Sequence, residues 1–142
     1  MKTHKLDYEK SREFFAKTAR DVRPKECYRN IFHASIRCLD DFIKGDLRIA
    51  YGYMQSLENV YVRHCFILDK EDRVIDPTIF CYERDEEKAR KTEYISFAVL
   101  SMEEYAKLLE ENSYYPDLCM VLRDEETQAI QEAFKKGLLF VG

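Results

Sequence analysis

The chain has 142 residues, of which 46% are hydrophobic and 35% are charged, with a formal net charge of −4 at pH 7. This length fits a single domain over residues 1–142 that buries a core of its own, and the mixed charges lack the basic surface that nucleic-acid binding requires. The start MKTHKLDYEK has no apolar leader and no run of 18 apolar residues follows, so we expect a cytosolic protein without a membrane span.

The first third of the chain is predicted to be helical. Residues 8–20 place their apolar side chains on one stripe, and Pro24 separates this first helix from the next. From Cys27 to about Lys44 the spacing is again helical, but apolar residues cover most of the circumference. A helix of this kind packs on several sides. We therefore expect the second helix to be central and buried.

After Gly45 the hydrophobic period changes to two residues, which predicts strands. The strands alternate apolar and polar residues or are rich in β-branched and aromatic ones, and Pro77 ends the third of them. They are predicted over residues 47–55, 60–68, 73–76 and 93–100.

Two further helices close the chain. Ser101 and Glu104 form a capping box at the start of a helix over 102–111. Asp124 and Gly137 are the predicted ends of the last helix. Helices followed by antiparallel strands and then by mixed elements indicate the α+β class rather than a parallel doubly wound sheet.

The cysteines of the chain are odd in number, and no two are spaced as C-x-x-C. That pattern argues against a structural zinc site and against a disulfide framework. Most of them should be buried small hydrophobes, but Cys27 lies at the predicted start of a helix, where the peptide dipoles favour a thiolate. The five are Cys27, Cys38, Cys65, Cys81 and Cys119.

A cysteine nucleophile needs a base, and histidine is the side chain suited to that task near neutral pH. His4 lies in the N-terminal segment, which we expect to be frayed, and His33 lies on the polar edge of the second helix, where solvation explains it. His64 lies inside a strand, on the same face as Val62 and Phe66. On its own this position also fits a core histidine bonded to the backbone.

The register of one hairpin decides whether Asp76 meets His64. A three-residue turn between Asp69 and Arg73 would place Phe66 opposite Asp76, which makes Asp76 and His64 diagonal neighbours on one face. A two-residue turn would send Asp76 to the other face. In the first register the carboxylate orients the imidazole and stabilises its cation. The alternative is a plain Asp-Pro turn at a strand end.

The ordered set of Cys27, Gly52-Tyr53, His64 and Asp76-Pro77-Thr78 resembles the transglutaminase-like branch of the papain-like cysteine enzymes. The resemblance covers roughly residues 24–80. It implies a papain-like α+β fold in which a buried central helix bearing the cysteine packs on a mainly antiparallel sheet.

The same resemblance implies roles for individual residues. Cys27 would be the nucleophile, His64 the general base and acid, and Asp76 the orienting carboxylate. In that branch the oxyanion is held partly by backbone N–H at the nucleophile. A side-chain helper varies, and the candidates here are Asn30, Tyr53 and Gln55.

These features favour an enzyme that acts on an amide or similar acyl bond through a thioester, without a cofactor. Hydrolysis of a peptide, protein or small amide substrate (as a peptidase, amidase or deamidase) is the expected outcome, and transfer to an amine is the other. A binding module on the same fold is the alternative, with residues 112–120 (NSYYPDLCM) as a partner surface. A metal held by His64 with Cys65 or Cys27 is disfavoured, because adjacent strand residues face opposite ways. The sequence leaves the oligomeric state open.

Overall fold

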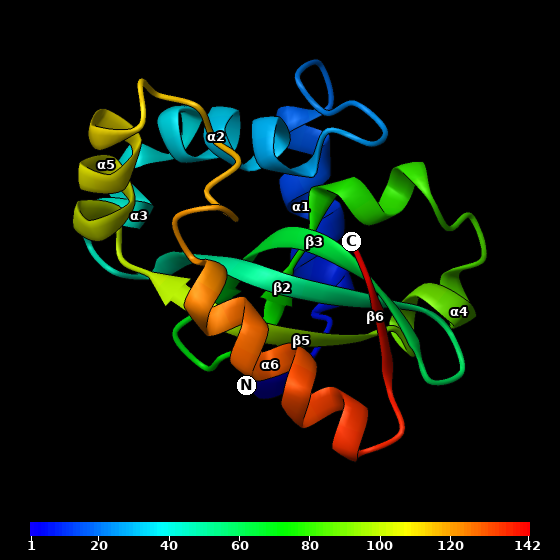
Figure 1. Cartoon of the computed structure of the whole chain (residues 1–142). Helices are drawn as coiled ribbons and strands as arrows, with labels where there is room; N and C mark the ends of the chain where they lie inside the picture. The colour runs from blue at the N-terminus through cyan, green and yellow to red at the C-terminus, as the bar shows by residue number, and fades with distance from the viewer.

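The computed structural model describes all residues, 1–142, and is built on a six-stranded sheet flanked by helices (Figure 1). No helix of the chain is long and apolar enough to cross a bilayer. The elements in chain order are β1 (Lys2–Lys5), α1 (Tyr8–Thr18), α2 (Cys27–Arg37), α3 (Leu39–Ile43), β2 (Leu47–Leu57), β3 (Val60–Asp69), β4 (Val74–Ile75), the 3₁₀ helix η1 (Pro77–Cys81), α4 (Glu86–Arg90), β5 (Glu93–Leu100), α5 (Met102–Glu111), α6 (Arg123–Lys135) and β6 (Leu139–Val141).

The sheet has the strand order β1-β5-β2-β3-β4, and every neighbouring pair along this path is antiparallel. β6 pairs with β3 as the sheet's parallel strand. The predicted α+β class is therefore confirmed, with a mainly antiparallel sheet and helices at its faces.

Alternation along the strands divides the core between the two faces of the sheet. Tyr51 and Cys65 belong to a cluster that the helices α2, α3 and α5 cover. Ala50 and Phe66, their chain neighbours, belong to a second cluster that η1 and α4 cover. Because His64 precedes Cys65 in the same strand, its side chain lies on the second face.

The edge of β3 is only partly paired. On one side β2 pairs along the whole strand. On the other side β4 pairs with Ile67 and Leu68, and β6 pairs with Val60–Val62. On this second side, residues 63–66 have no strand neighbour. Helix α2 contacts β3. This gap in the edge is where the start of α2 meets the sheet.

The prediction of one long central helix from Cys27 to Lys44 is wrong. α2 ends at Arg37, Cys38 takes a non-helical conformation (φ −114°, ψ 36°), and α3 follows as a separate helix. The apolar circumference is not fully buried either, since Ile36 is 60% exposed and Ile43 is 66% exposed. Only the stripe that faces the sheet packs, because no second layer covers the outer side.

Two smaller expectations also differ from the structure. His4 is not in a frayed end: it is 3% exposed in β1, where its ring bonds to Ser96 Oγ at 2.7 Å. Asp124 does not cap the last helix, which begins one residue earlier at Arg123. By contrast, the capping box of Ser101 and Glu104 is confirmed.

Gly52 permits a bulge in the centre of the sheet. Tyr51 pairs with Ala98 but Gly52 pairs with Ser96, so Phe97 is the extra residue on β5. A β-carbon at Gly52 would lie 1.8 Å from the Ile95 carbonyl oxygen, which leaves no room for any other residue. The bulge lies where β5 pairs with β2, on the edge of β2 opposite to β3 and His64.

We expect Gly52→Ala to lower the free energy of unfolding by about 3 kcal/mol or more, because the backbone of β5 must move away. Urea denaturation followed by circular dichroism measures the change. Gly45→Ala is the control: Gly45 has φ +82° but no atom near its added β-carbon, so only backbone strain is incurred. Equal losses in the two variants would contradict the close approach at Gly52.

Candidate active site

Cys27 is the first residue of α2, and the side chain of the preceding Glu26 makes no capping bond. The first helical hydrogen bond comes from Asn30 N–H to Glu26 O, at 2.8 Å. The N–H groups of Cys27, Tyr28 and Arg29 therefore have no partner within the helix. Their partial positive charge lies beside the thiol, where it favours an anion.

The segment that leads into α2 is held in an unusual conformation. Lys25 has φ 63° although it is not a glycine, and its N–H donates to the Tyr82 hydroxyl at 2.8 Å. The Tyr82 ring in turn lies edge-on to His64, with ring centroids 6.4 Å apart. Tyr82 thus ties the backbone before Cys27 to the wall around the histidine.

His64 and Asp76 form a buried pair. The His64 Nε2 atom lies 2.8 Å from Asp76 Oδ2, and the two residues are 2% and 0% exposed. β3 pairs with β4 so that Ile67 lies opposite Ile75. This register is the one that a three-residue turn over 70–72 produces, so the prediction that Asp76 shares a face with His64 is confirmed.

The carboxylate of Asp76 is also held by other donors. The Tyr94 hydroxyl donates to Oδ2 at 2.7 Å, and Thr78 N–H donates to Oδ1 at 3.0 Å. The Asp76 N–H donates to Ser11 Oγ at 3.0 Å. Burial, with the Asp76 charge next, raises the pKa of Tyr94 well above its usual value, so the phenol stays a donor. Both carboxyl oxygens of Asp76 therefore take part in hydrogen bonds.

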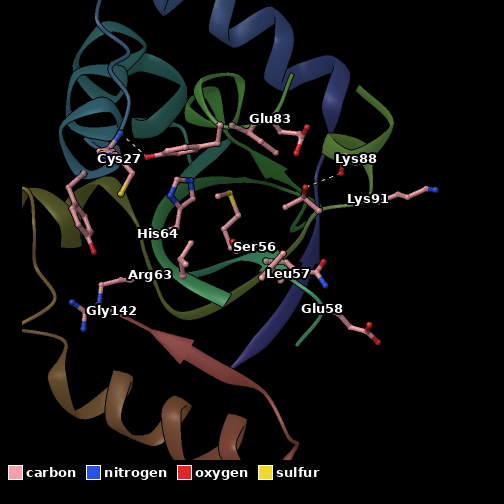
Figure 2. Close-up of a pocket in the computed structure, with 18 of the residues that line it drawn as sticks. Cys27, Ser56, Leu57, Glu58, Arg63, His64, Glu83, Lys88, Lys91 and Gly142 are labelled. Atoms are coloured by element: carbon pink, nitrogen blue, oxygen red, sulfur yellow. Dashed lines mark hydrogen bonds between the residues drawn. The ribbon is translucent and has the colours of Figure 1, made fainter. Parts of the chain in front are cut away.

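The charge of Asp76 outweighs the effect of burial on His64. Burial lowers the pKa of His64, but the charge and hydrogen bond of Asp76, followed by the Cys27 side chain, raise it to about 10. The ring therefore holds a second proton at neutral pH. Nε2 is engaged by Asp76, which leaves Nδ1 to exchange a proton with Cys27. Figure 2 shows the sulfur of Cys27 next to the His64 ring.

Both residues line a cavity of about 740 Å³. Its walls come from the start of α2, the β2–β3 hairpin, and the segment from η1 to β5. In Figure 2, Arg63 and Gly142 lie on the same side as Cys27, and Glu58 and Lys91 lie across the cavity. The lining residues are Lys25, Cys27, Tyr28, Met54, Gln55, Ser56, Leu57, Glu58, Val62, Arg63, His64, Ile79, Tyr82, Glu83, Lys88, Lys91, Thr92, Asp117 and Gly142.

Asn30, a candidate oxyanion helper, is used elsewhere. Its amide nitrogen donates to Arg23 O at 2.8 Å and to Thr78 Oγ1 at 3.1 Å, which uses both of its protons. The side chain is 2% exposed and does not line the cavity. Asn30 therefore fixes the loop before α2 and the segment after Asp76, and has no donor left for a substrate.

The other two candidates differ from each other. The Tyr53 hydroxyl donates to Glu126 Oε2 at 2.6 Å, on the sheet face away from the cavity. Gln55 does line the cavity, and its Oε1 accepts from Glu93 N–H at 3.4 Å. Its amide nitrogen is then the one side-chain donor of the three candidates that is available at the cavity.

Sequence reasoning missed Tyr94, Tyr82 and Ser11. The alternation of residues 93–100 assigns Tyr94 to one face of β5, but its contact with Asp76 depends on how distant strands pair. Tyr82 and Ser11 reach the site from η1 and α1, and no local spacing connects them to it.

Comparison with known proteins found no matching family model, no similar curated protein and no similar solved structure. The function of this chain is therefore inferred from the geometry of Cys27, His64 and Asp76.

The raised pKa of His64 predicts how stability depends on pH. Between pH 6.5 and about 10 the folded protein keeps a proton that the unfolded chain has released. This contribution is fully present below pH 6.5 and is lost as pH rises through 10, with a slope of up to about 1.4 kcal/mol per pH unit. Asp76→Asn should flatten this part of the curve. Urea denaturation from pH 6 to 10 measures it.

The control is Asp72→Asn, which removes an ion pair on the same hairpin at a partly exposed site. Its stability should follow the wild-type slope over this pH range, because Asp72 has a lowered pKa, the bonds from Lys2 and Arg48 being the main causes. Parallel curves for wild type and Asp76→Asn would exclude a charged His64.

Proposed function

We propose that this chain is a cysteine-dependent acyl-transfer enzyme of the papain-like, transglutaminase-like type, and that it hydrolyses an amide or similar acyl bond. The observation that carries the proposal is the buried His64–Asp76 pair beside Cys27 in one cavity. Titratable groups perturbed by both burial and a specific partner, at the wall of a cavity, are characteristic of catalytic sites. The uncapped start of α2 supplies the donors that acyl chemistry requires.

The proposed first half-reaction forms a thioester. In the proposed reactive form His64 already holds a proton on Nδ1 and Cys27 is a thiolate, and this thiolate attacks the carbonyl carbon of the substrate. As the C–S bond forms, the negative charge on oxygen is held by N–H groups at the start of α2. The intermediate collapses, the C–N bond breaks, and His64 returns its proton to the leaving amine.

The proposed second half-reaction restores the enzyme. His64 removes a proton from water, and the hydroxyl attacks the thioester carbonyl. The C–S bond breaks, the acid leaves, and the pair of Cys27 thiolate and protonated His64 is restored. Asp76 stays ionised throughout and stabilises the imidazolium, as the carboxylate of a catalytic triad does. An amine in place of water would give transfer instead of hydrolysis.

A protein-binding module on the same fold is the second candidate, and one surface favours it. The loop after α5 exposes Tyr114, Tyr115 and Met120 by 62%, 67% and 78%. Large aromatic and Met side chains are enriched at interfaces. In that case the buried pair would serve the scaffold only, and Cys27 would react no faster than an ordinary thiol.

Alkylation by iodoacetamide distinguishes the two candidates. We expect Cys27 to react at least about tenfold faster than Cys81 at pH 6.5, where an ordinary thiol with a pKa near 8.5 is only about 1% thiolate. Cys81 is an exposed reference within the same chain, although burial raises its pKa somewhat. Peptide mass spectrometry of quenched samples gives both rates.

His64→Ala should lower the Cys27 rate to that of an ordinary thiol, and its pH profile should shift upward. His33→Ala is the matched control, since His33 is a half-buried residue of α2 that does not line the cavity. An unchanged rate in His64→Ala would remove the basis for catalysis and leave the binding module.

A further inference from the structure

β6 runs along the edge of β3 toward the nucleophile. Val60 pairs with Leu139 and Val62 pairs with Val141 in a parallel register. Continued in that register, the two positions after Val141 are level with Arg63 and His64. Gly142, the first of these, lines the same cavity as Cys27 and His64. Figure 1 shows this strand rising beside β3 to end near its middle.

The strand is held as a bound peptide is held. Leu139 and Val141 are 60% and 41% exposed, so their side chains contribute little packing. Phe140 is the anchor: its ring stacks on Tyr53 with centroids 4.1 Å apart and contacts Tyr61 at 5.8 Å. Main-chain pairing to a sheet edge, with a pocket for alternate side chains, is the pattern of β-strand addition.

The direction of β6 matches that of an acyl donor. In a peptide substrate, the residues before the reacting bond lead, from N to C, up to the carbonyl that the thiol attacks. β6 approaches Cys27 in this sense. We propose that the β3 edge at Val60–Val62 binds the residues that precede the reacting carbonyl of an extended peptide substrate, and that residues 139–142 occupy this subsite as an intramolecular stand-in. The inference rests on the proposed acyl-transfer function.

The occupied subsite also specifies which peptide fits. The slot of Phe140 between Tyr53 and Tyr61 takes an aromatic side chain. At the position of Gly142, a β-carbon would lie 3.4 Å from the guanidinium of Arg63.

Arg63 cannot move away easily, because it makes two hydrogen bonds to Glu126, both 2.8 Å long. A β-carbon at Gly142 would be in ordinary van der Waals contact with Arg63, so only a side chain longer than that of alanine would press on the pair. The expected substrate therefore has an aromatic residue two positions before a glycine or alanine whose carbonyl reacts.

The probe is acetyl-Phe-Val-Gly chloromethyl ketone, which follows the sequence and register of residues 140–142. The Cys27 thiolate attacks the methylene carbon, a C–S bond forms, and chloride leaves. In wild type, β6 competes with the probe. Phe140→Ala removes the aromatic anchor and should raise the rate of Cys27 labelling roughly tenfold, the effect of losing one stacked and buried aromatic contact. The rate with iodoacetamide, which needs no subsite, should not change.

Two controls separate displacement of β6 from general loosening. Phe134→Ala removes an 82% exposed aromatic residue of α6 and should leave both rates unchanged. Leu139→Pro removes the N–H that donates to Asn59 O at 2.8 Å, and should act like Phe140→Ala. In Phe140→Ala, probes with Ala in place of Phe, or Leu in place of Gly, should react more slowly than the parent probe.

Parallel acceleration by both reagents, or equal rates for the three probes, would overturn the subsite. Failure of the proposed function gives a different result, because Cys27 then reacts with iodoacetamide no faster than Cys81 in every variant. Binding to the subsite can also be measured without the thiol, in the double variant Cys27→Ser/Phe140→Ala. The measurement is the fluorescence anisotropy of a dye-labelled acetyl-Phe-Val-Gly amide. Binding that is lost when Phe140 is restored supports the subsite, and absence of binding in both proteins rules it out.

Discussion

The buried ion pair of His64 and Asp76 constrains the structure around it. Removing two charged groups from water costs several kcal/mol for each, and their attraction repays this only when the remaining polar atoms are also satisfied. Here the Tyr94 hydroxyl from β5 and the Thr78 N–H from η1 donate to the carboxylate, and Ser11 Oγ from α1 accepts from the Asp76 N–H. Two distant segments of the chain, β5 and α1, must therefore arrive together before the pair is stable. A buried pair is weak evidence for stability but a good indicator of chemistry, because an apolar pair of similar volume would cost less.

The same residues leave open the stretch of the β3 edge at which Cys27 lies. Asp76 bonds to the N–H of Thr78 and caps η1, with Pro77 in the first turn, so β4 ends after two residues. Because β4 is short, this edge of β3 is unpaired from Arg63 to Phe66, between the part that pairs with β6 and the part that pairs with β4. The first turn of α2 enters at this gap. A longer β4 would cover the gap and separate the thiol from the imidazole. Short pairing at this edge is thus a condition of the site.

How much of this could be predicted from the sequence depends on the range of the interactions. The turn after Asp69 is local, so the polar segment reduced the register to two alternatives, and the structure has the three-residue turn that places Asp76 and His64 on one face. The capping box of Ser101 is equally local. Tyr94 and β6 depend on pairing between strands that are far apart in sequence, which a single sequence does not contain. The break at Cys38 was missed for another reason: apolar side chains continue through it, and several of them, such as Ile36, turn out to be exposed.

β6, a short and weakly packed strand, lies beside the His64–Asp76 pair, which is held by many contacts. β6 has three residues, one aromatic anchor and two exposed side chains, whereas the His64–Asp76 pair is locked by contacts from three elements. Local opening takes place at the least stable segments of a protein, and binding loops are drawn from such segments. Opening of β6 would uncover the β3 edge without disturbing Tyr94 or Ser11, neither of which it contacts through a hydrogen bond. The fold thus allows access to Cys27 to change while the His64–Asp76 pair keeps its geometry.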